Sequence, residues 1–171
     1  MAQNDFVAKA VDRWSQVFEG HDLSSLGVIQ RLVWCGRSAD GLLNRSAKEL
    51  GFRRRGDYEV LALLRRSEPT ELTPADVASE LLVSPSVMTG RIDRLEEQGL
   101  LKRKPDTVDR RAVRLSLTDQ GRVQVNVAFL ANLAIYDQIL ASFDVRDRAE
   151  LERLLGRLLE GLRATSQASN R

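Results

Sequence analysis

The chain is poor in the residue types that carry most catalytic and metal chemistry. Its 171 residues include one cysteine and one histidine, which excludes an intrachain disulfide and leaves little for a transition-metal site. The sequence also lacks a glycine-rich phosphate loop, an internal repeat and any evident pair of nucleophile and base. We therefore expect no cofactor, no metal and no catalytic residues, and an enzyme is the least favoured class.

Long hydrophobic runs are missing as well. No apolar run approaches the roughly 20 residues that a membrane-spanning helix needs, and Met1 to Gln16 lack the continuous apolar core of a signal peptide. The residues are 43% hydrophobic and 29% charged, with a net charge of only +2. This balance is typical of a soluble globular chain with one domain, or one domain with helical extensions. We expect a cytoplasmic protein with no membrane partner.

What the sequence does contain is two successive helix starts within residues 72–99. Each start has a hydroxyl N-cap residue followed by proline at the first helical position, where no backbone donor is needed, and the first also has a capping-box aspartate. These residues are Thr73, Pro74, Asp76, Ser84 and Pro85. Gly99 is expected to end the second helix. The pattern predicts two short helices joined by a turn.

The second of these helices has one apolar and one open face. Met88, Ile92 and Leu95 recur at i, i+4 and i+7 and define a buried stripe. At about 100° per residue, Arg91 lies close to that stripe, so we expect it to point inward and to need a partner there. The residues expected on the open face are Ser86, Thr89, Gly90, Asp93 and Arg94. Small hydroxyl residues and a glycine near a helix N-terminus suit close approach to a nucleic-acid groove.

A charged hairpin follows. Residues 100–104 and 113–117 read as two strands, and residues 105–110 as the turn between them. From residue 102 to residue 114 there are six basic and two acidic side chains, so positive charge is concentrated where a hairpin reaches phosphates. Asp109 and Arg111 are two residues apart, which lets the carboxylate hold the guanidinium. The alternative is a solvated charged turn with no role.

A helix-turn-helix followed by Pro105-Asp106-Thr107-Val108-Asp109-Arg110-Arg111 and then Leu117-Thr118-Asp119-Gln120-Gly121-Arg122 resembles the MarR family of bacterial transcription regulators. The resemblance implies a mainly α (α+β) fold, a winged helix-turn-helix with a two-stranded wing, flanked by N- and C-terminal dimerisation helices. It implies double-stranded DNA as the partner, with the second helix in the major groove. The expected DNA-binding residues are Ser84, Ser86, Val87, Thr89, Gly90, Arg94, Lys104, Asp109, Arg110 and Arg111.

Amphipathic helices are expected on both sides of this unit. The pattern predicts helices over residues 5–18, 26–50, 55–66, 118–140 and 145–163, with Ser24 or Ser25 capping the second. We expect N-terminal helices for dimerisation and a ligand pocket in residues 1–50, the DNA-binding unit in 51–118, C-terminal dimerisation helices in 119–165 and a flexible tail in 166–171. The last helix carries a leucine face, Leu151, Leu154, Leu155, Leu158, Leu159 and Leu162. It packs either on its own chain or on a second copy, and we favour a homodimer on a palindromic operator.

Cys35 lies in the middle of the long second helix. It is either a peroxide-sensing thiolate, as in some regulators of this family, or a small buried core residue, which we favour because no histidine or clustered base is near it in sequence. The three consecutive arginines of residues 53–55 either contact phosphate or acidic side chains of a neighbouring helix, or form a solvated cluster.

The resemblance also suggests an effector site. Urate-responsive members of the family use a tryptophan, an acidic residue and two arginines, and Trp14, Glu59, Arg91 and Arg103 occupy the corresponding positions, with glutamate in place of aspartate. A flat anionic aromatic compound, urate-like or phenolic, would stack on the ring while the arginines neutralise it. In the alternative, Trp14 is ordinary core and Arg91 forms a structural ion pair with Glu59. A further alternative is a broader hydrophobic pocket that accepts aromatic acids or drugs.

The function predicted is therefore sequence-specific, ligand-responsive repression of transcription. The alternatives are a winged-helix protein-interaction module without an operator and a redox-sensing regulator based on Cys35.

Overall fold

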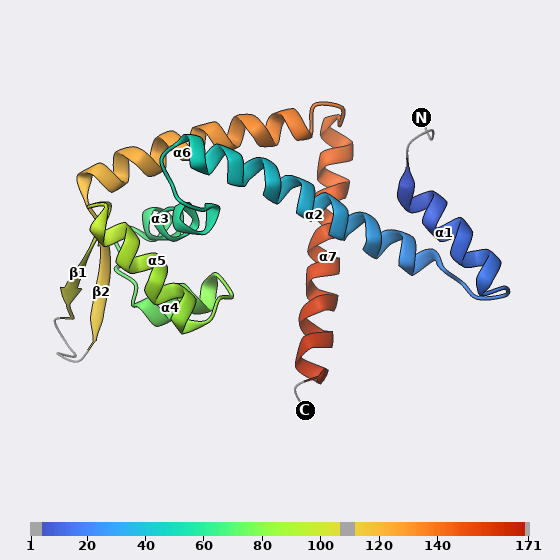
Figure 1. Cartoon of the computed structure of the whole chain (residues 1–171), viewed down its shortest axis with the longest axis horizontal. Helices are drawn as coiled ribbons and strands as arrows, with labels where there is room; N and C mark the ends of the chain where they lie inside the picture. The colour runs from blue at the N-terminus through green and yellow to red at the C-terminus, as the bar shows by residue number, and fades with distance from the viewer. Residues whose placement is uncertain (1–4, 107–111, 170–171) are drawn as a thin grey trace. The chain divides into compact units, whose positions relative to one another are not determined.

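The structure, a computed structural model, describes residues 5–106 and 112–169. Along these ranges the elements are α1 (Phe6–Val17), α2 (Ser24–Glu49), α3 (Arg55–Ser67), α4 (Pro74–Glu80), α5 (Pro85–Glu97), β1 (Leu101–Pro105), β2 (Val113–Leu117), α6 (Asp119–Ile139) and α7 (Val145–Ser169) (Figure 1). The chain divides into two compact units, Met1–Phe129 and Leu130–Arg171. Among the described helices, none combines the length and the apolar character needed to cross a membrane. The mostly helical fold with a two-stranded antiparallel wing confirms the predicted fold class.

The first unit is built around one hydrophobic core shared by α3, α4, α5 and the sheet. Leu115 on β2 pairs with Leu72 just before α4, and this bridge joins the sheet to the helix-turn-helix. The first turns of α6 add Val125 and Ala128 to the same core. Its largest fully buried side chains include Phe52, Leu61, Leu63, Met88, Ile92, Leu95, Leu100 and Leu115. Burial of this apolar face is the main force that fixes α5 against α3 and the sheet.

The predicted helix ends in the winged unit, residues 51–118, are confirmed. Thr73 and Asp76 form a complete capping box at the start of α4, and Ser84 accepts a hydrogen bond from the Val87 N–H at the start of α5. Gly51 and Gly99 have φ of +85° and +68° just after α2 and α5. Glycine adopts this left-handed conformation without the steric cost that other residues meet.

The junction between the wing and α6 depends on a close backbone approach. Thr118 donates its hydroxyl to the Gly99 carbonyl at 2.7 Å and accepts from the Gly121 N–H at 2.9 Å. A Cβ at Gly121 would lie 1.9 Å from the Leu100 carbonyl oxygen. The leucine-threonine-x-x-glycine motif is thus required by packing: threonine caps α6, and only glycine fits against the start of the wing.

The structure corrects three predicted boundaries. Ser24 is the first helical residue of α2 rather than its cap, and the Asp22 carboxylate accepts from its N–H at 2.9 Å. β1 begins at Leu101 instead of residue 100, because the Leu100 N–H still bonds to the Leu95 carbonyl of α5. The C-terminal segment expected to be a flexible tail continues α7 to Ser169.

Cys35 is also a correction. It is exposed on α2 rather than buried in the core. The core lies against the C-terminal part of that helix, where Leu43 and Ala47 are buried. Arg55 at the start of α3, by contrast, contacts an acidic side chain of a neighbouring helix, as one of the two alternatives proposed: its guanidinium lies 2.5 Å from the Asp40 carboxylate of α2.

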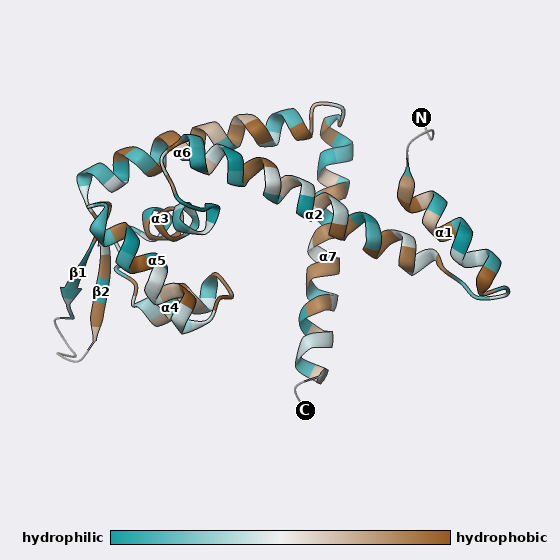
Figure 2. Cartoon of the chain, viewed as in Figure 1, coloured by the Kyte–Doolittle hydropathy of each residue, from teal (hydrophilic) through white to brown (hydrophobic). Residues whose placement is uncertain are grey.

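The second unit consists of the latter part of α6 and the whole of α7. Asp144 caps α7 by accepting from the Asp147 N–H at 2.8 Å, and Arg148 donates to the carbonyls of Phe143 and Leu140. Figure 2 shows hydrophobic residues recurring along α7. Four of its leucines, Leu154, Leu155, Leu159 and Leu162, are exposed in the single chain.

Candidate nucleic-acid interface

One face of α5 is open and lined by small residues. Ser84, Ser86, Val87 and Thr89 are exposed, and Gly90 is half-buried. The hydroxyls of Ser84 and Ser86 lie 3.2 Å apart at the helix N-terminus, while Thr89 donates to the Pro85 carbonyl at 3.0 Å. The buried stripe of the same helix is Met88, Ile92 and Leu95, as predicted. The helix therefore presents short polar side chains and its N-terminal backbone on the side away from the core.

Arg94 departs from the predicted arrangement. We expected it on the open face, but its guanidinium turns toward α3 and donates to the Asp57 carboxylate at 2.8 Å. The Asp57 side chain is 2% exposed and that of Arg94 is 28% exposed. The hydrogen bond that Arg94 donates to Asp57 is the main cause that raises the pKa of Arg94 above its ordinary value. The long, flexible stem of arginine lets it reach a buried carboxylate from a position that helical geometry places near solvent.

Arg91 faces inward, as predicted. Its guanidinium donates to the Gly56 carbonyl at 3.2 Å and lies 3.8 Å from the Glu59 carboxylate. Its side chain is mostly buried, and a Cβ at Gly56 would lie 2.3 Å from its central guanidinium carbon. Glu59 also contacts Arg55 at 3.1 Å. A chain of ion pairs therefore runs from Asp40 on α2 through α3 to α5.

Arg103 on β1 holds the opposite flank of α5. Its guanidinium lies 2.5 Å from the Asp93 carboxylate and also pairs with Glu96. The hydrogen bond that Arg103 donates to Asp93 is the main reason that the pKa of Arg103 is raised above its ordinary value. Pairing neutralises Asp93, which would otherwise place a bare negative charge on the exposed face. Ion pairs thus tie α5 to α3 on one side and to the wing on the other.

The wing is an antiparallel pair in which Lys102 faces Ser116 and Lys104 faces Arg114. Lys104, expected to contact DNA, forms an ion pair with Glu71 at 2.6 Å, although its side chain stays 44% exposed. Arg114 pairs with the buried Asp106. The remaining predicted wing contacts, Asp109, Arg110 and Arg111, lie outside the described residues.

The four residues proposed for an effector do not form one cluster in the described chain. Arg91 and Glu59 are paired, Arg103 binds other carboxylates, and the Trp14 ring stacks on Phe18 at 5.6 Å within the N-terminal segment. Trp14 is 49% exposed, so the alternative in which it is ordinary core is wrong for the single chain. The other half of that alternative, a pair between Arg91 and Glu59, agrees with the structure.

Several residues that position α5 were missed by sequence reasoning. Asp57 and Gly56 on α3 and Asp93 and Glu96 on α5 itself hold the helix in place. One signal was available: Val60, Leu61 and Leu64 lie three, four and seven residues after Asp57, so the helical repeat places this aspartate on the buried face of α3. A charge buried there needs a cationic partner.

Comparisons with known proteins agree with this geometry. The sequence pattern of the MarR family matches residues 50–112. The chain is 30% identical over 159 residues to the HTH-type transcriptional regulator PecS of Dickeya dadantii, covering 92% of this chain and 95% of that protein. The crystal structure of a mutant MarR from E. coli is similar with a TM-score of 0.64 and 26% identity, over 76% of this chain and 95% of that one. The crystal structure of the same mutant complexed with operator DNA has a TM-score of 0.69 and 24% sequence identity, over 82% of this chain and 99% of that one.

Proposed function

Since the chain belongs to the MarR family and is a DNA-binding transcriptional regulator, we propose that α5 is its recognition helix and enters the major groove. The observation that carries this proposal is the open face of α5, where Ser84, Ser86, Val87 and Thr89 are exposed at the helix N-terminus. Free N–H groups at a helix N-terminus bind phosphates, and hydroxyls contact base edges. No enzymatic step forms part of the proposal.

The pairing of the arginines on α5 shapes how it reads DNA. Arg91 and Arg94 are both turned toward α3, so base contacts fall to the serine and threonine hydroxyls unless Arg94 exchanges Asp57 for a base. Positive charge for the phosphates comes from the wing, where Lys102 is exposed and where we still expect Arg110 and Arg111 to contact DNA. The protein should therefore show strong salt dependence together with modest discrimination per base pair.

A footprint tests this assignment. Binding to DNA upstream of the chain's own gene should protect two half-sites about one helical turn apart. Affinity should fall steeply with salt, with a log–log slope near 0.9 for each phosphate contact. A protein whose affinity for DNA hardly responds to salt, or that protects no discrete site, does not use α5 and the wing in this way.

We also propose that the protein is a homodimer. Outside the winged unit, the single chain leaves many large apolar side chains exposed on α1, α2, α6 and α7; they include Phe6, Trp14, Val28, Trp34, Val127, Phe129, Leu130, Leu133, Leu155 and Leu159. Exposed apolar side chains of this size commonly mark contacts with another protein chain. A second copy of the same chain covers them and places two α5 helices on a palindromic operator.

The oligomeric state in solution tests the dimer. Leu155→Glu places a charge in the leucine face of α7 and should shift light scattering from a dimer toward a monomer of 19.2 kDa. Arg157→Glu is the matched control, because two residues further along a helix point to nearly the opposite side. A wild-type protein that is already monomeric at micromolar concentration contradicts the proposal, as does a Leu155→Glu dimer as tight as the control.

We further propose that the protein is a repressor released by a small anionic aromatic compound, urate-like or phenolic, that binds at Arg91. The support is that the Arg91 guanidinium donates to the Gly56 carbonyl but has no carboxylate within hydrogen-bond distance among the described residues, since its contact with Glu59 is 3.8 Å long. An anion competing for this guanidinium would change the contacts between α3 and α5, and so the position of the recognition helix. Trp14 contributes only if its ring, which lies elsewhere in the described chain, reaches this site in the assembled protein.

Gly56→Ala is a sharp probe of this effector site. The new methyl group would overlap the Arg91 guanidinium and displace it without altering its charge. Urate and phenolic carboxylates should release the wild-type protein from DNA, and release from this variant should need a higher concentration. Gly41→Ala on α2, where a Cβ meets open space, is the control. No release of the wild type at millimolar concentrations contradicts the effector proposal and leaves the DNA-binding assignment standing.

A further inference from the structure

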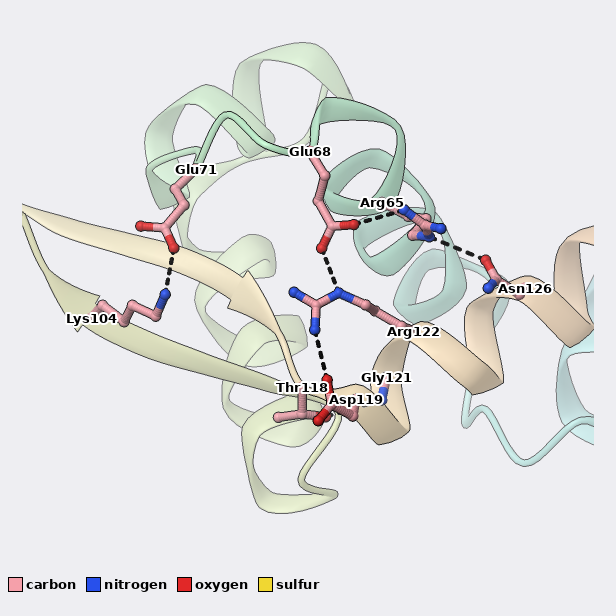
Figure 3. Close-up of polar contacts among 9 residues, drawn as sticks. All are labelled: Arg65, Glu68, Glu71, Lys104, Thr118, Asp119, Gly121, Arg122 and Asn126. Atoms are coloured by element: carbon pink, nitrogen blue, oxygen red, sulfur yellow. Dashed lines mark hydrogen bonds and ion pairs between the residues drawn. The ribbon is translucent and has the colours of Figure 1, made fainter.

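A cavity at the base of the wing belongs neither to the α5 face nor to the Arg91 site. It has a volume of about 500 Å³ and lies between the end of α3, the following loop, the two strands and the first turn of α6. Figure 3 draws six of its lining residues as sticks: Glu68, Glu71, Lys104, Thr118, Asp119 and Arg122. The cavity lining includes Leu64, Glu68, Glu71, Lys102, Ser116 and Arg122. This volume falls in the range typical of small-molecule sites.

One wall of the cavity is a face of the sheet. Lys102 and Ser116 are directly opposite each other in the register, and both line the cavity. The Ser116 side chain is 9% exposed, and its hydroxyl oxygen is shut off from water without a hydrogen-bond partner among the described residues. Buried hydroxyls nearly always have a partner, and an unpaired one is costly. Ser116 is thus an unused donor next to an open space.

The acidic groups around the cavity are already engaged. Glu68 accepts from Arg65 at 2.7 Å and from Arg122 at 2.8 Å, and Arg122 also pairs with Asp119 at 2.9 Å. Glu71 pairs with Lys104 (Figure 3). The carboxylates are therefore neutralised by cations that the chain itself supplies, and they leave no demand for a cationic ligand.

The groups left open are donors. No residue in the described ranges lies within hydrogen-bond or ion-pair distance of the exposed Lys102 ammonium. The Ser116 hydroxyl lies across the strand from it. An ammonium and a hydroxyl side by side match the two oxygens of a carboxylate, one for each donor. The hydroxyl is covered, so a ligand reaches it only after a lining side chain moves, and the Lys102 side chain, which has no partner among the described residues, can move without breaking an ion pair.

The rest of the lining is partly apolar. Leu64, Pro69, Leu115 and Leu117 are also among the cavity's lining residues. We propose that this cavity binds a small monocarboxylate with an apolar body, whose carboxylate accepts from Ser116 and pairs with Lys102. The site is separate from the one at Arg91, so it adds a second ligand-binding site to each chain.

Titration of the full-length protein with hexanoate, using hexanamide as the neutral isostere, tests this assignment. Calorimetry should show hexanoate binding at least tenfold more tightly than hexanamide. Ser116→Ala should weaken hexanoate binding about tenfold, because it removes a hydrogen bond to a charged group. Lys102→Gln should weaken it about threefold, because an exposed ion pair contributes less. The Ser116→Ala protein should fold normally, since the hydroxyl makes no bond to lose.

Two control variants distinguish binding in this cavity from binding at the Arg91 site or at a surface lysine. Lys9→Gln removes an exposed lysine from α1 and should leave hexanoate binding unchanged, and Gly56→Ala should also leave it unchanged although it disturbs Arg91. The proposal is wrong if hexanoate does not bind at about ten millimolar, if hexanamide binds equally well, or if Ser116→Ala and Lys102→Gln both bind like the wild type. Loss of binding in Gly56→Ala alone would assign hexanoate to the Arg91 site instead.

Discussion

The Asp57 carboxylate on α3 accepts two hydrogen bonds from Arg94 on α5, from Nη2 at 2.8 Å and from Nε at 3.4 Å. The aspartate is almost completely buried, whereas the arginine is partly exposed. Because of this asymmetry, removing the arginine leaves an unpaired charge in the protein interior, whereas removing the aspartate leaves a charge that can reach water. The pair also fixes α5 against α3.

The cost of breaking this pair should depend on which partner is removed. Arg94→Ala leaves a buried carboxylate without its cation and should lower the free energy of unfolding by about 3 kcal/mol. Asp57→Ala leaves an arginine that can reach water, and we expect a loss of about 1 kcal/mol. Urea unfolding at one fixed protein concentration measures both. The pair does not have this asymmetry if Asp57→Ala proves to be the more costly substitution.

Leu82, in the turn between α4 and α5, is strained. Its φ is +53° and its side chain is 92% exposed. The left-handed conformation costs a residue with a Cβ about 1 kcal/mol, and asparagine tolerates it best after glycine. Leu82→Asn should therefore raise the free energy of unfolding by several tenths of a kcal/mol to about 1 kcal/mol. A lower melting temperature for this variant would show that the turn is not strained.

Gly121 should not tolerate a side chain. An alanine Cβ would overlap the Leu100 carbonyl oxygen, which belongs to backbone and cannot step aside as a side chain does. Gly121→Ala should lower the free energy of unfolding by about 2 kcal/mol or more, within the usual range for overpacking. Gly156→Ala, where a Cβ meets open space in the middle of α7, should instead be neutral or stabilising. Equal unfolding transitions for both variants would refute the close approach.

The capping box of α4 should make stability depend on pH in acid. The backbone N–H of Thr73 is the main cause that lowers the pKa of Asp76 below its ordinary value of 3.8. A lowered pKa stabilises the fold fully above the unfolded-state value, and this contribution is lost as the pH falls through the folded-state value. The difference in unfolding free energy between wild type and Asp76→Asn should be about 1 kcal/mol near neutral pH and shrink below pH ~4. A difference in unfolding free energy that grows as the pH falls would contradict this role of Asp76.

Local rules predicted most of the winged unit. Caps at Thr73 and Ser84 and left-handed glycines after α2 and α5 mark helix ends with signals that lie within a few residues. The alternating side chains of β2 follow from the two-residue repeat of a strand, and the apolar stripe of α5 follows from the 3.6-residue repeat of a helix. These features depend on neighbouring residues, and the sequence carries that information directly.

Partners that are distant in sequence were not predictable in the same way. Arg94 is 37 residues from Asp57, and Lys104 is 33 residues from Glu71. A flexible basic side chain can choose among several carboxylates, so helical position alone does not decide where its charge goes. Cys35 shows the same limit for burial, because its exposure depends on which end of α2 the core covers.

DNA binding by a variant altered only on the open face of α5 tests the account most directly. Ser86→Ala combined with Thr89→Ala removes two exposed hydroxyls and leaves the buried stripe and the ion pairs of α5 untouched. Affinity for the footprinted operator should fall about tenfold or more, because each substitution removes one hydrogen bond to the DNA. Affinity for unrelated DNA should stay near that of the wild type. Ser38→Ala on α2 is the control variant and should bind like the wild type. Unchanged operator affinity in the double variant would contradict the assignment of α5 as the helix that reads the sequence.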